Sequence, residues 1–325
     1  MNPRRSLVVL IAATAPLLSA HSHGQTDYPV KPIRLIVGFA AGGISDVLAR
    51  ALAAKLSMSI GQQVVVENKA GAGTTIAGDQ VAKSAPDGYT LWLQDITTHA
   101  INVSLYPKLP YDSLRDFTTV ALVASTPLML VVHPSTPAKN VPELVTFLKT
   151  KPGEHSYGSS GNGTILHLTS ELFNSTAGVN VVHVPYKGSS PATQAILGGE
   201  VAYVFSTMPP AVSAVKSGRL RALAVTTPAR VSTAPDVPTM IEAGMPAFEV
   251  VLYSGVLGPA GLPRPIVAKL NAEFAKVVAS DEIKTVYANL GAEPISTTPE
   301  RFAARINEEI AKLGKLVKSS GAKVE

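Results

Sequence analysis

Apolar and polar residues alternate along the chain in blocks that predict strands and helices in turn. The first clear unit spans residues 31–55, where the nearly continuous apolar run at 33–39 is typical of a strand buried on both faces of a parallel sheet. Gly42 and Gly43 end this run, and from Ile44 the apolar residues recur at helical spacing. The pattern therefore predicts a strand, a tight glycine turn and a helix.

The same alternation continues along the chain and predicts an α/β fold. Apolar runs with branched residues predict further strands at 63–68, 89–94, 119–125, 128–133, 156–158, 181–185, 201–206, 220–226 and 250–257. Apolar residues at helical spacing predict helices at 74–84, 141–151, 165–176, 211–217, 237–243, 265–279 and 299–319, and one that ends near Leu197. Between residues 100 and 117 the pattern loosens around two prolines, and Pro127 separates two of the strands.

Two crossings divide the predicted elements into two lobes. Residues 25–124 and 249–325 are expected to form the first lobe, onto which the two long C-terminal helices pack, and residues 125–248 to form the second. Ligands of open α/β sheets bind outside the carboxyl ends of the strands. The sequence therefore predicts a ligand cleft between two α/β lobes that are joined by two crossover strands.

Glycine-rich loops lead from strands into helices at several places. They lie at 40–43, 159–163 and 186–191. Such a loop leaves backbone N–H groups unpaired at the helix start, where the helix dipole also favours an anion. We expect these loops to cradle a carboxylate or a phosphate. The alternative is that they are ordinary turns of an α/β protein.

The N-terminal residues predict export. Arg4 and Arg5 precede an apolar stretch at 7–18 and small residues before a cleavage site after Gly24, which is typical of a secretory signal peptide at 1–24. The arginine pair alone is weak support for twin-arginine export. No later segment has about 18 uninterrupted apolar residues, and the chain has no cysteine. These features suit a soluble periplasmic protein without disulfides.

Charge and motif content exclude several classes of function. Removal of the signal peptide lowers the formal net charge from +5 to +3, because it takes away two arginines and no acid. With no Lys/Arg cluster in the chain, we expect no nucleic-acid partner. The glycine loops match no nucleotide fingerprint, and the histidines lack metal-ligand spacing, so we expect no cofactor and no metal. The mature histidines are His99, His133, His155, His167 and His183.

The motifs of serine enzymes are incomplete. Ser160 follows Gly158 but precedes Asn162, so the nucleophile elbow Gly-x-Ser-x-Gly is absent. Ser213 and Lys216 match Ser-x-x-Lys, but the companion motifs of that enzyme class do not occur. We therefore expect a binding protein and no enzyme, with an exported α/β hydrolase as the less favoured alternative.

Motifs along the whole mature chain carry a resemblance to one family. They are PIRLIV at 32–37, GG with Asp46 at 42–46, VENK at 66–69, GAG at 71–73, APDGYTL at 85–91, VPYKG at 184–188, LRALAVT at 220–226, PDVPT at 235–239, GPAG at 258–261, GAEP at 291–294 and TPE at 298–300. By these motifs the chain resembles the Bug family, the TctC-like periplasmic solute receptors of tripartite tricarboxylate transporters.

The resemblance implies a monomeric, two-lobed periplasmic binding protein of type II-like architecture that closes on a small carboxylate. Its partners would be that ligand and the membrane permease subunits of a tripartite tricarboxylate transporter. Di- and tricarboxylates, acidic amino acids and aromatic acids all remain candidate ligands. A receptor that reports to a membrane sensor kinase is the alternative function.

The resemblance also implies where the ligand binds. The expected contacts lie in four loops and at the end of one strand, and they are Phe39, Ala40, Ala41, Gly42, Gly43, Ser45, Asp95, Thr97, Thr98, Ser159, Ser160, Gly161, Thr164, His167, Tyr186, Lys187, Gly188, Ser189 and Ser206. Asp46 is expected to fix its loop, because a carboxylate beside a bound carboxylate is repulsive.

Several of these residues have two interpretations. His167 either contacts the ligand or makes a hydrogen bond that fixes its loop, and Lys187 either anchors a carboxylate or is solvated. Family members usually carry a small residue where Asp95 stands and an aspartate where Ser206 stands, while Tyr253 replaces a frequent tryptophan. We expect Asp95 to accept a hydrogen bond from a donor on the ligand, and the alternative is that it caps the helix that follows.

Overall fold

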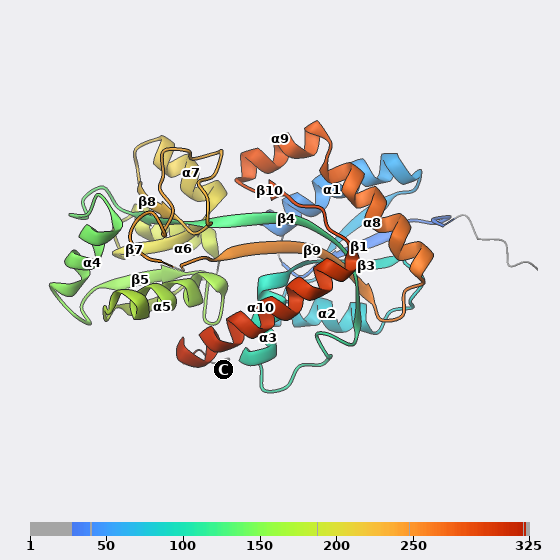
Figure 1. The fold of residues 1–325 in the computed structure, drawn as a ribbon, viewed down its shortest axis with the longest axis horizontal. Coiled ribbons are helices and arrows are strands. Elements are labelled where there is room, and N and C mark those ends of the chain that lie inside the picture. The colour runs from blue at the N-terminus through green and yellow to red at the C-terminus, as the bar shows by residue number, and fades with distance from the viewer. Residues whose placement is uncertain (1–27, 40, 187, 247, 321, 323–325) are drawn as a thin grey trace, which may run out of the picture.

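The computed structural model describes residues 28–39, 41–186, 188–246, 248–320 and 322 as a mixed α/β protein (Figure 1). The strands are β1 (Ile33–Val37), β2 (Val64–Asn68), β3 (Thr90–Asp95), β4 (Phe117–Val132), β5 (Ser156–Ser159), β6 (Val182–Pro185), β7 (Tyr203–Thr207), β8 (Arg221–Val225), β9 (Val251–Pro259) and β10 (Glu293–Pro294). The helices are α1 (Ile44–Ile60), the short 3₁₀ helix η1 (Ala72–Thr74), α2 (Thr75–Ala82), α3 (Ile96–Leu105), α4 (Val141–Lys149), α5 (Ile165–Ala177), α6 (Ser189–Leu197), α7 (Met208–Lys216), α8 (Arg264–Val278), α9 (Asp281–Leu290) and α10 (Pro299–Ser320).

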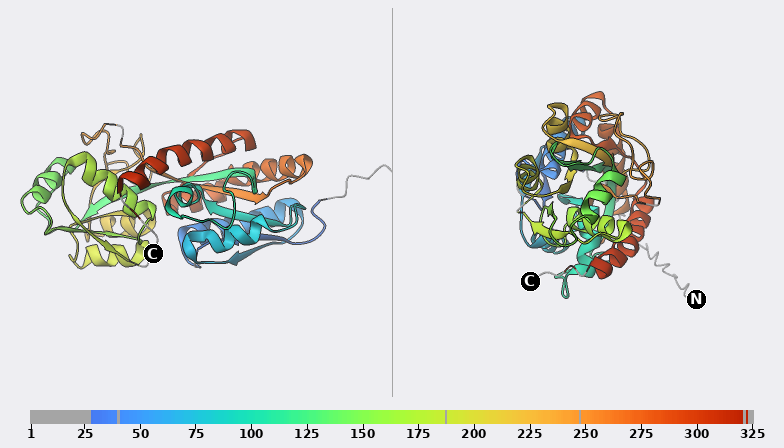
Figure 2. Two further views of the ribbon diagram at one scale, coloured as in Figure 1. Left: turned by 90° about the horizontal axis from the view of Figure 1, so that it is seen from below. Right: turned by 90° about the vertical axis from the view of Figure 1, so that its left-hand side faces the viewer.

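Most of the described strands follow one another along a single path. The order is β2-β1-β3-β9-β4-β7-β5-β6, and both β8 and β10 also pair with β4. Strands β1, β2 and β3 are parallel at one end of this path, and β5, β6 and β7 are parallel at the other. The long antiparallel strands β4 and β9 run between the two ends (Figures 1 and 2).

Each end of the path has its own hydrophobic core. The core around β1 and β3 includes Leu35, Leu93 and Phe274, and the core around β5 and β7 includes Phe173 and Phe205. Burial of such side chains stabilises each by about 1.5–3 kcal/mol relative to exposure. Two compact groups of strands and helices therefore lie at the two ends of β4 and β9.

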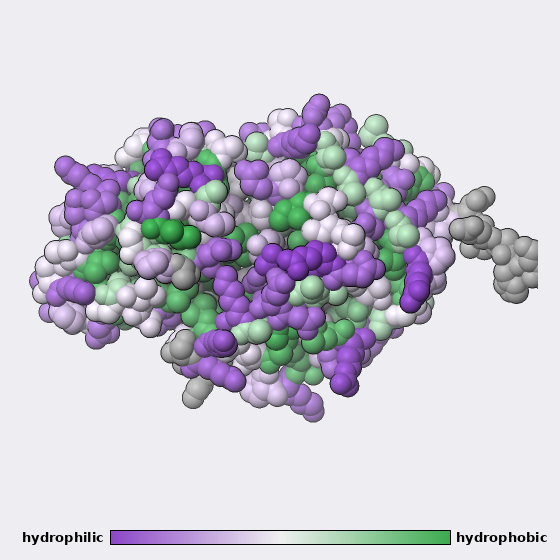
Figure 3. All heavy atoms as spheres, in the orientation of Figure 1, coloured by the Kyte–Doolittle hydropathy of each residue, from purple (hydrophilic) through white to green (hydrophobic). Residues whose placement is uncertain are grey.

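Helix α10 packs against both groups, which differs from the expectation that it covers the first lobe alone. Its Phe302 and Ile306 pack in a cluster with Trp92, whereas Leu313 and Val317 belong to the core that contains Phe173. The helix has 22 residues, which span about 33 Å at 1.5 Å per residue, and this length lets it reach across. Polar side chains gather over α10 on the face that Figure 3 shows.

Strand β4 is continuous, although two separate strands were expected on either side of Pro127. Its pairing with β9 ends at Pro127, which lies opposite Val251, and its pairing with β7 begins at Leu128. A proline lacks the backbone N–H that a sheet ladder needs. At the point where the strand changes partners that loss is small, so the strand continues.

Two further expectations about secondary structure were wrong, and one helix was not predicted. Helix α3 occupies part of the segment expected to be loose, and no prediction was made for the segment that forms α9. The helix expected at 237–243 is absent from the structure, where the segment forms a bridge and turns. Val225 donates its N–H to the Pro238 carbonyl at 2.8 Å and accepts from Met240 N–H at 2.9 Å, so pairing with β8 overrides the helical pattern.

Two features of the described residues bear on function. None of the described helices is long and apolar enough to cross a membrane. Within the same part of the chain, no group of three or more His, Cys, Asp and Glu side chains is arranged to hold a metal ion. The predicted signal peptide at 1–24 lies outside the described residues.

Candidate functional site

Helix starts gather at the carboxyl ends of the parallel strands. In the first group β1 leads into α1 and β3 into α3, and in the second group β5, β6 and β7 lead into α5, α6 and α7. The register pairs Val37 of β1 with Leu93 of β3, so the loop that follows β1 and the start of α3 lie at the same edge of the sheet. The loops predicted to bind ligand therefore lie at one edge of each parallel group.

The loop before α1 is fixed by the buried side chain of Asp46. Its carboxylate accepts hydrogen bonds from Gly42 N–H at 2.9 Å, from Asn68 Nδ2 at 2.9 Å and from Arg50 Nε at 3.0 Å. Burial raises the pKa of Asp46, but these hydrogen bonds outweigh it and hold the pKa below its usual value. Asp46 thus fixes its loop, as expected, while Gly42 and Gly43 are exposed.

Asp95 caps the start of α3. One oxygen, Oδ1, accepts from Thr97 N–H at 2.8 Å and from Thr98 N–H at 3.0 Å. Burial raises the pKa of Asp95, although the hydrogen bonds from Thr98 and Thr97 oppose this shift. The interpretation of Asp95 as a helix cap is confirmed. Neither of these backbone bonds uses its second oxygen.

The loop between β5 and α5 is held by its own hydroxyl groups. Thr164 caps α5 and its Oγ1 donates to the Gly161 carbonyl at 2.8 Å, while Ser160 Oγ donates to Thr164 Oγ1 at 2.9 Å. Gly161 and Gly163 have φ angles of 128° and 72°, which favour glycine. These contacts fix the path of the loop while leaving Ser160 and Gly161 partly exposed.

Two histidines contact the loop between β5 and α5 and help to fix it. His167 Nδ1 accepts the N–H of Gly163 at 3.1 Å, which is the loop-fixing one of its two interpretations, and His183 Nε2 lies 2.6 Å from Ser159 Oγ. The two rings stack with centroids 4.0 Å apart and planes within 4°. Burial lowers the pKa of both, and that of His183 falls to about 4 with a further contribution from His167. Both rings are therefore neutral at pH 7.

Hydrogen bonds connect the loop between β6 and α6, and the first residue of α6, to strands β5 and β7. Tyr186 N–H donates to the Ser159 carbonyl at 3.0 Å, and Ser189 Oγ lies 2.9 Å from Thr207 Oγ1. Gly188 has a φ of 125° and begins the helix. Ser206 is fully buried, and its hydroxyl lies 2.9 Å from Thr193 Oγ1.

The helix starts differ in whether a side chain satisfies their N–H groups. Asp95 and Thr164 cap α3 and α5, whereas the starts of α1, α6 and α7 at Gly43, Gly188 and Thr207 have no side-chain cap. Helix α7 carries prolines in its first turn and so offers fewer donors. Of these five helices, α1 and α6 therefore keep the most uncapped donors, although Pro191 removes one N–H from the first turn of α6.

The two groups touch at the rim of these loops. A Cβ added at Gly163 would lie 2.3 Å from Leu105 Cδ2, and one added at Gly291 would lie 2.4 Å from Met208 Cβ, so each glycine lets the other group approach. Between the described site loops of the two groups, no hydrogen bond occurs. The predicted contacts Ala40 and Lys187 lie outside the described residues.

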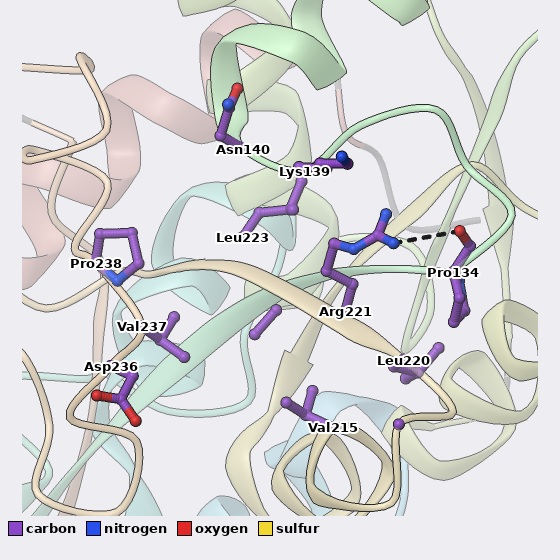
Figure 4. A pocket seen from close by; sticks show the side chains of 12 residues that line it. Pro134, Lys139, Asn140, Val215, Leu220, Arg221, Leu223, Asp236, Val237 and Pro238 are labelled. Carbon is purple, nitrogen blue, oxygen red and sulfur yellow. Dashed lines mark hydrogen bonds between the residues drawn. The ribbon is translucent and has the colours of Figure 1, made fainter.

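A cavity of about 510 Å³ lies away from these loops, beside β8 (Figure 4). Arg221 lines it, but the guanidinium donates to the carbonyls of Pro134, Thr136 and Ala138 at 3.4, 3.3 and 2.8 Å. The charge of Arg221 is therefore used to hold the turn at 134–138. This cavity contains none of the residues predicted to bind ligand.

Sequence reasoning missed residues that support the site from behind. His183 was considered only as a metal ligand, and Asn68, which donates to the Phe39 carbonyl at 3.0 Å, was only part of a motif. His183 lies opposite Tyr157 in the β5–β6 register, and the two rings stack. The alternation of side chains along the strand at 181–185 was a signal in the sequence that could have indicated His183 as a neighbour of the Ser159 loop.

Comparisons with known proteins agree on one family. The model of the tripartite tricarboxylate transporter family receptor matches residues 48–322. Protein BugT of Bordetella pertussis is 38% identical over the full length of both chains. The structure of R. palustris Rpa4515 with adipate is 36% identical with a TM-score of 0.84, and that of MatC from Rhodopseudomonas palustris with bound malate is 34% identical with a TM-score of 0.80. They cover 92% and 89% of this chain and all of their own.

Proposed function

The chain belongs to the tripartite tricarboxylate transporter receptor family, and from this we propose that it is a solute-binding receptor that captures a small carboxylate between its two groups of strands and helices. Two structural relatives carry adipate and malate, which are both carboxylates. The ligand contacts we propose are the other loop residues predicted from the sequence, with Asp46, Asn68, Ser159, His167 and His183 as residues that position them.

The observation that carries this proposal is the distribution of uncapped helix starts. Helices α1 and α6 begin at Gly43 and Gly188 without a side chain that accepts their first N–H groups. Such N–H groups and the positive end of the helix dipole favour an anion. One such start comes from each group, so a carboxylate ligand would be held from both sides.

We further propose that the two groups are lobes that close on the ligand. Residues 25–124 and 249–325 would form one lobe and 125–248 the other. Supporting this division, β4 and β9 are the strands that run between the groups, and β4 changes partners at Pro127. Hinged closure is the usual response of such a clefted architecture to ligand.

A catalytic role for the Ser159–His183 pair is disfavoured by its chemistry. The 2.6 Å separation resembles that of a nucleophile and its base. However, burial lowers the pKa of His183 to about 4, which makes the imidazole a weak base at neutral pH. Ser159 is fully buried and already bonded to Gly161. We infer that the pair fixes the loop and that the protein is a receptor, not an enzyme.

The proposed location is the periplasm, with membrane permease subunits as the proposed partners. The signal peptide predicted at 1–24 supports this location, and the family supports the partners.

A thermal-shift screen of carboxylates tests the proposal, because a ligand that binds only the folded state raises its apparent stability. We expect at least one dicarboxylate, acidic amino acid or aromatic acid to raise the melting temperature. Small-angle scattering with that ligand should show a smaller radius of gyration. If no carboxylate stabilises the protein at millimolar concentration, the proposal is wrong.

A further inference from the structure

The turn that leads from β2 into α2 has an unusual backbone conformation. Its consecutive residues Gly71, Ala72, Gly73 and Thr74 have φ angles of 138°, 44°, 58° and 75°. Glycine adopts such angles readily, whereas a residue with a Cβ seldom does, and a β-branched residue is an outlier there. Ala72 and Thr74 therefore hold strained conformations.

The surroundings of Thr74 hold it in this conformation. Thr74 is only 1% exposed, and its side chain packs on the backbone of Gly38, where an added Cβ would lie 2.6 Å from Thr74 Cβ. Thr74 Oγ1 accepts a hydrogen bond from Gln94 Nε2 at 2.7 Å. Strain of this kind persists only where the neighbouring structure over-determines it, and it clusters at active sites and ligand clamps. Gly38 and Gln94 are the neighbours that constrain Thr74.

Both contacts of Thr74 lead directly to loops predicted to bind ligand. Gly38 precedes Phe39, where the loop between β1 and α1 begins, and Gln94 precedes Asp95, the cap of α3. The other polar atom of the Gln94 side chain, Oε1, is buried without a hydrogen-bond partner among the described residues, so Thr74 provides the bond that holds this side chain. One strained residue thus touches the segments that lead into both loops.

The rest of the turn is tied to α3 and its C-terminal end. Asn102 Nδ2 donates to the Gly73 carbonyl at 2.7 Å, and a Cβ added at Gly73 would lie 2.7 Å from the Tyr106 hydroxyl oxygen. Thr75 Oγ1 donates to the Ala72 carbonyl at 2.9 Å, which closes the turn on itself. A movement of this turn would therefore be transmitted to the helix that follows β3.

We propose that Thr74 is a positioning residue of the carboxylate site, which fixes the loop between β1 and α1 and the start of α3 relative to each other. Thr74 acts through Gly38 and Gln94 and does not itself contact the ligand. This inference rests on the proposed function, because the two loops that Thr74 positions are proposed to bind the carboxylate. A purely structural role would instead change stability and leave the affinity of the folded protein unchanged.

Calorimetry and melting curves of three variants separate positioning from stability. Thr74→Gly removes both contacts but relieves the strain, so we expect the melting temperature to change little and the affinity for the best carboxylate of the thermal-shift screen to fall about fivefold or more. Ala72→Gly is the matched control, because Ala72 has a φ of 44° and is exposed, and it should keep the parent affinity. Thr74→Ser keeps the hydroxyl that accepts from Gln94 and should bind within about twofold of the parent.

Hydrogen exchange of the ligand-free chain tests the same role without a ligand. The amides of Gly42 and Thr97, each bonded to an aspartate, should exchange faster in Thr74→Gly and at the parent rate in Ala72→Gly. Parent-like affinity of Thr74→Gly, an equal loss in Ala72→Gly or in Thr74→Ser, or unchanged exchange at both amides would each overturn the proposal. If no carboxylate binds the parent, the proposed function is wrong, and the exchange rates alone decide whether Thr74 positions the loops.

Discussion

His167 and His183 stack with ring centroids 4.0 Å apart, and each makes one hydrogen-bonding contact to the Ser159–Thr164 loop. One histidine comes from α5 and the other from β6, so the pair joins two elements behind the loop. Because both rings are neutral, their stacking carries no charge repulsion at pH 7. The pair is therefore a rigid support for a loop that we propose contacts the ligand.

The first prediction concerns the hydrogen bond from this support to the loop. His183→Phe keeps an aromatic ring against His167 but removes the contact with Ser159. We expect a stability loss of about 1 kcal/mol and carboxylate binding weakened by about tenfold, because the loop is no longer held. Calorimetry and urea unfolding measure the two effects. His133→Gln, at a partly exposed histidine that follows β4, is the control, and unchanged carboxylate affinity in His183→Phe would contradict the role of the support.

The second prediction concerns acid stability. Burial lowers the pKa of His99 from its ordinary 6.5 to about 4, so between these pH values the unfolded chain takes up a proton at this residue and the folded chain does not. Stability is therefore lost as the pH falls, by about 3 kcal/mol at this residue over that range. His99→Phe retains ring packing against Trp92 and Phe117 and removes the titration. Its unfolding free energy should fall less between pH 7 and pH 4 than that of the parent; an equal fall would contradict this assignment.

The third prediction concerns the close approach of the two groups. Gly163→Ala places a Cβ against Leu105 and also strains a φ of 72°. Gly178→Ala is a matched control, because Gly178 has a φ of 62° but no atom within 4 Å of its added Cβ. We expect about 1–2 kcal/mol of destabilisation in the control from backbone strain and a clearly larger loss in Gly163→Ala. Urea unfolding of both variants would contradict the contact if the two losses were equal.

Short-range patterns predicted most elements, and long-range contacts explain the exceptions. The unit of β1, Gly42–Gly43 and α1 was predictable because apolar spacing and glycine act within a few residues. Pro127 was taken for a strand end, since the sequence does not show that β4 changes partners there. The helix predicted at 237–243 was wrong for a similar reason, because the backbone hydrogen bonds of Pro238 and Met240 to Val225 are not visible in the local pattern of residues.

The residues of the site also divide into those that short-range patterns predicted and those that they did not. The positions of the loops could be predicted from glycine and serine motifs, whereas the residues that support the loops are placed by pairing between strands. His183 is brought to Ser159 by the register of β5 and β6.

The fourth prediction separates the two roles of Asp95. Asp95→Ala removes the cap of α3 and should cost about 1 kcal/mol of stability, whereas Asp95→Asn keeps an acceptor and should cost less. If the second carboxylate oxygen also accepts from the ligand, the parent should favour malate and aspartate over succinate, and both variants should lose that preference. Calorimetry with these three acids measures it. If both variants bound all three as the parent does while only their melting temperatures fell, Asp95 would be a cap alone.

The central claim is that backbone N–H groups at uncapped helix starts hold a carboxylate. The most direct test is calorimetry with the best carboxylate from the thermal-shift screen and with its neutral amide, on the same full chain. The claim predicts that the amide binds far more weakly, because the helix starts of α1 and α6 would meet no negative charge. Binding of the amide within about threefold of the acid, a difference of only about 0.7 kcal/mol, would contradict it.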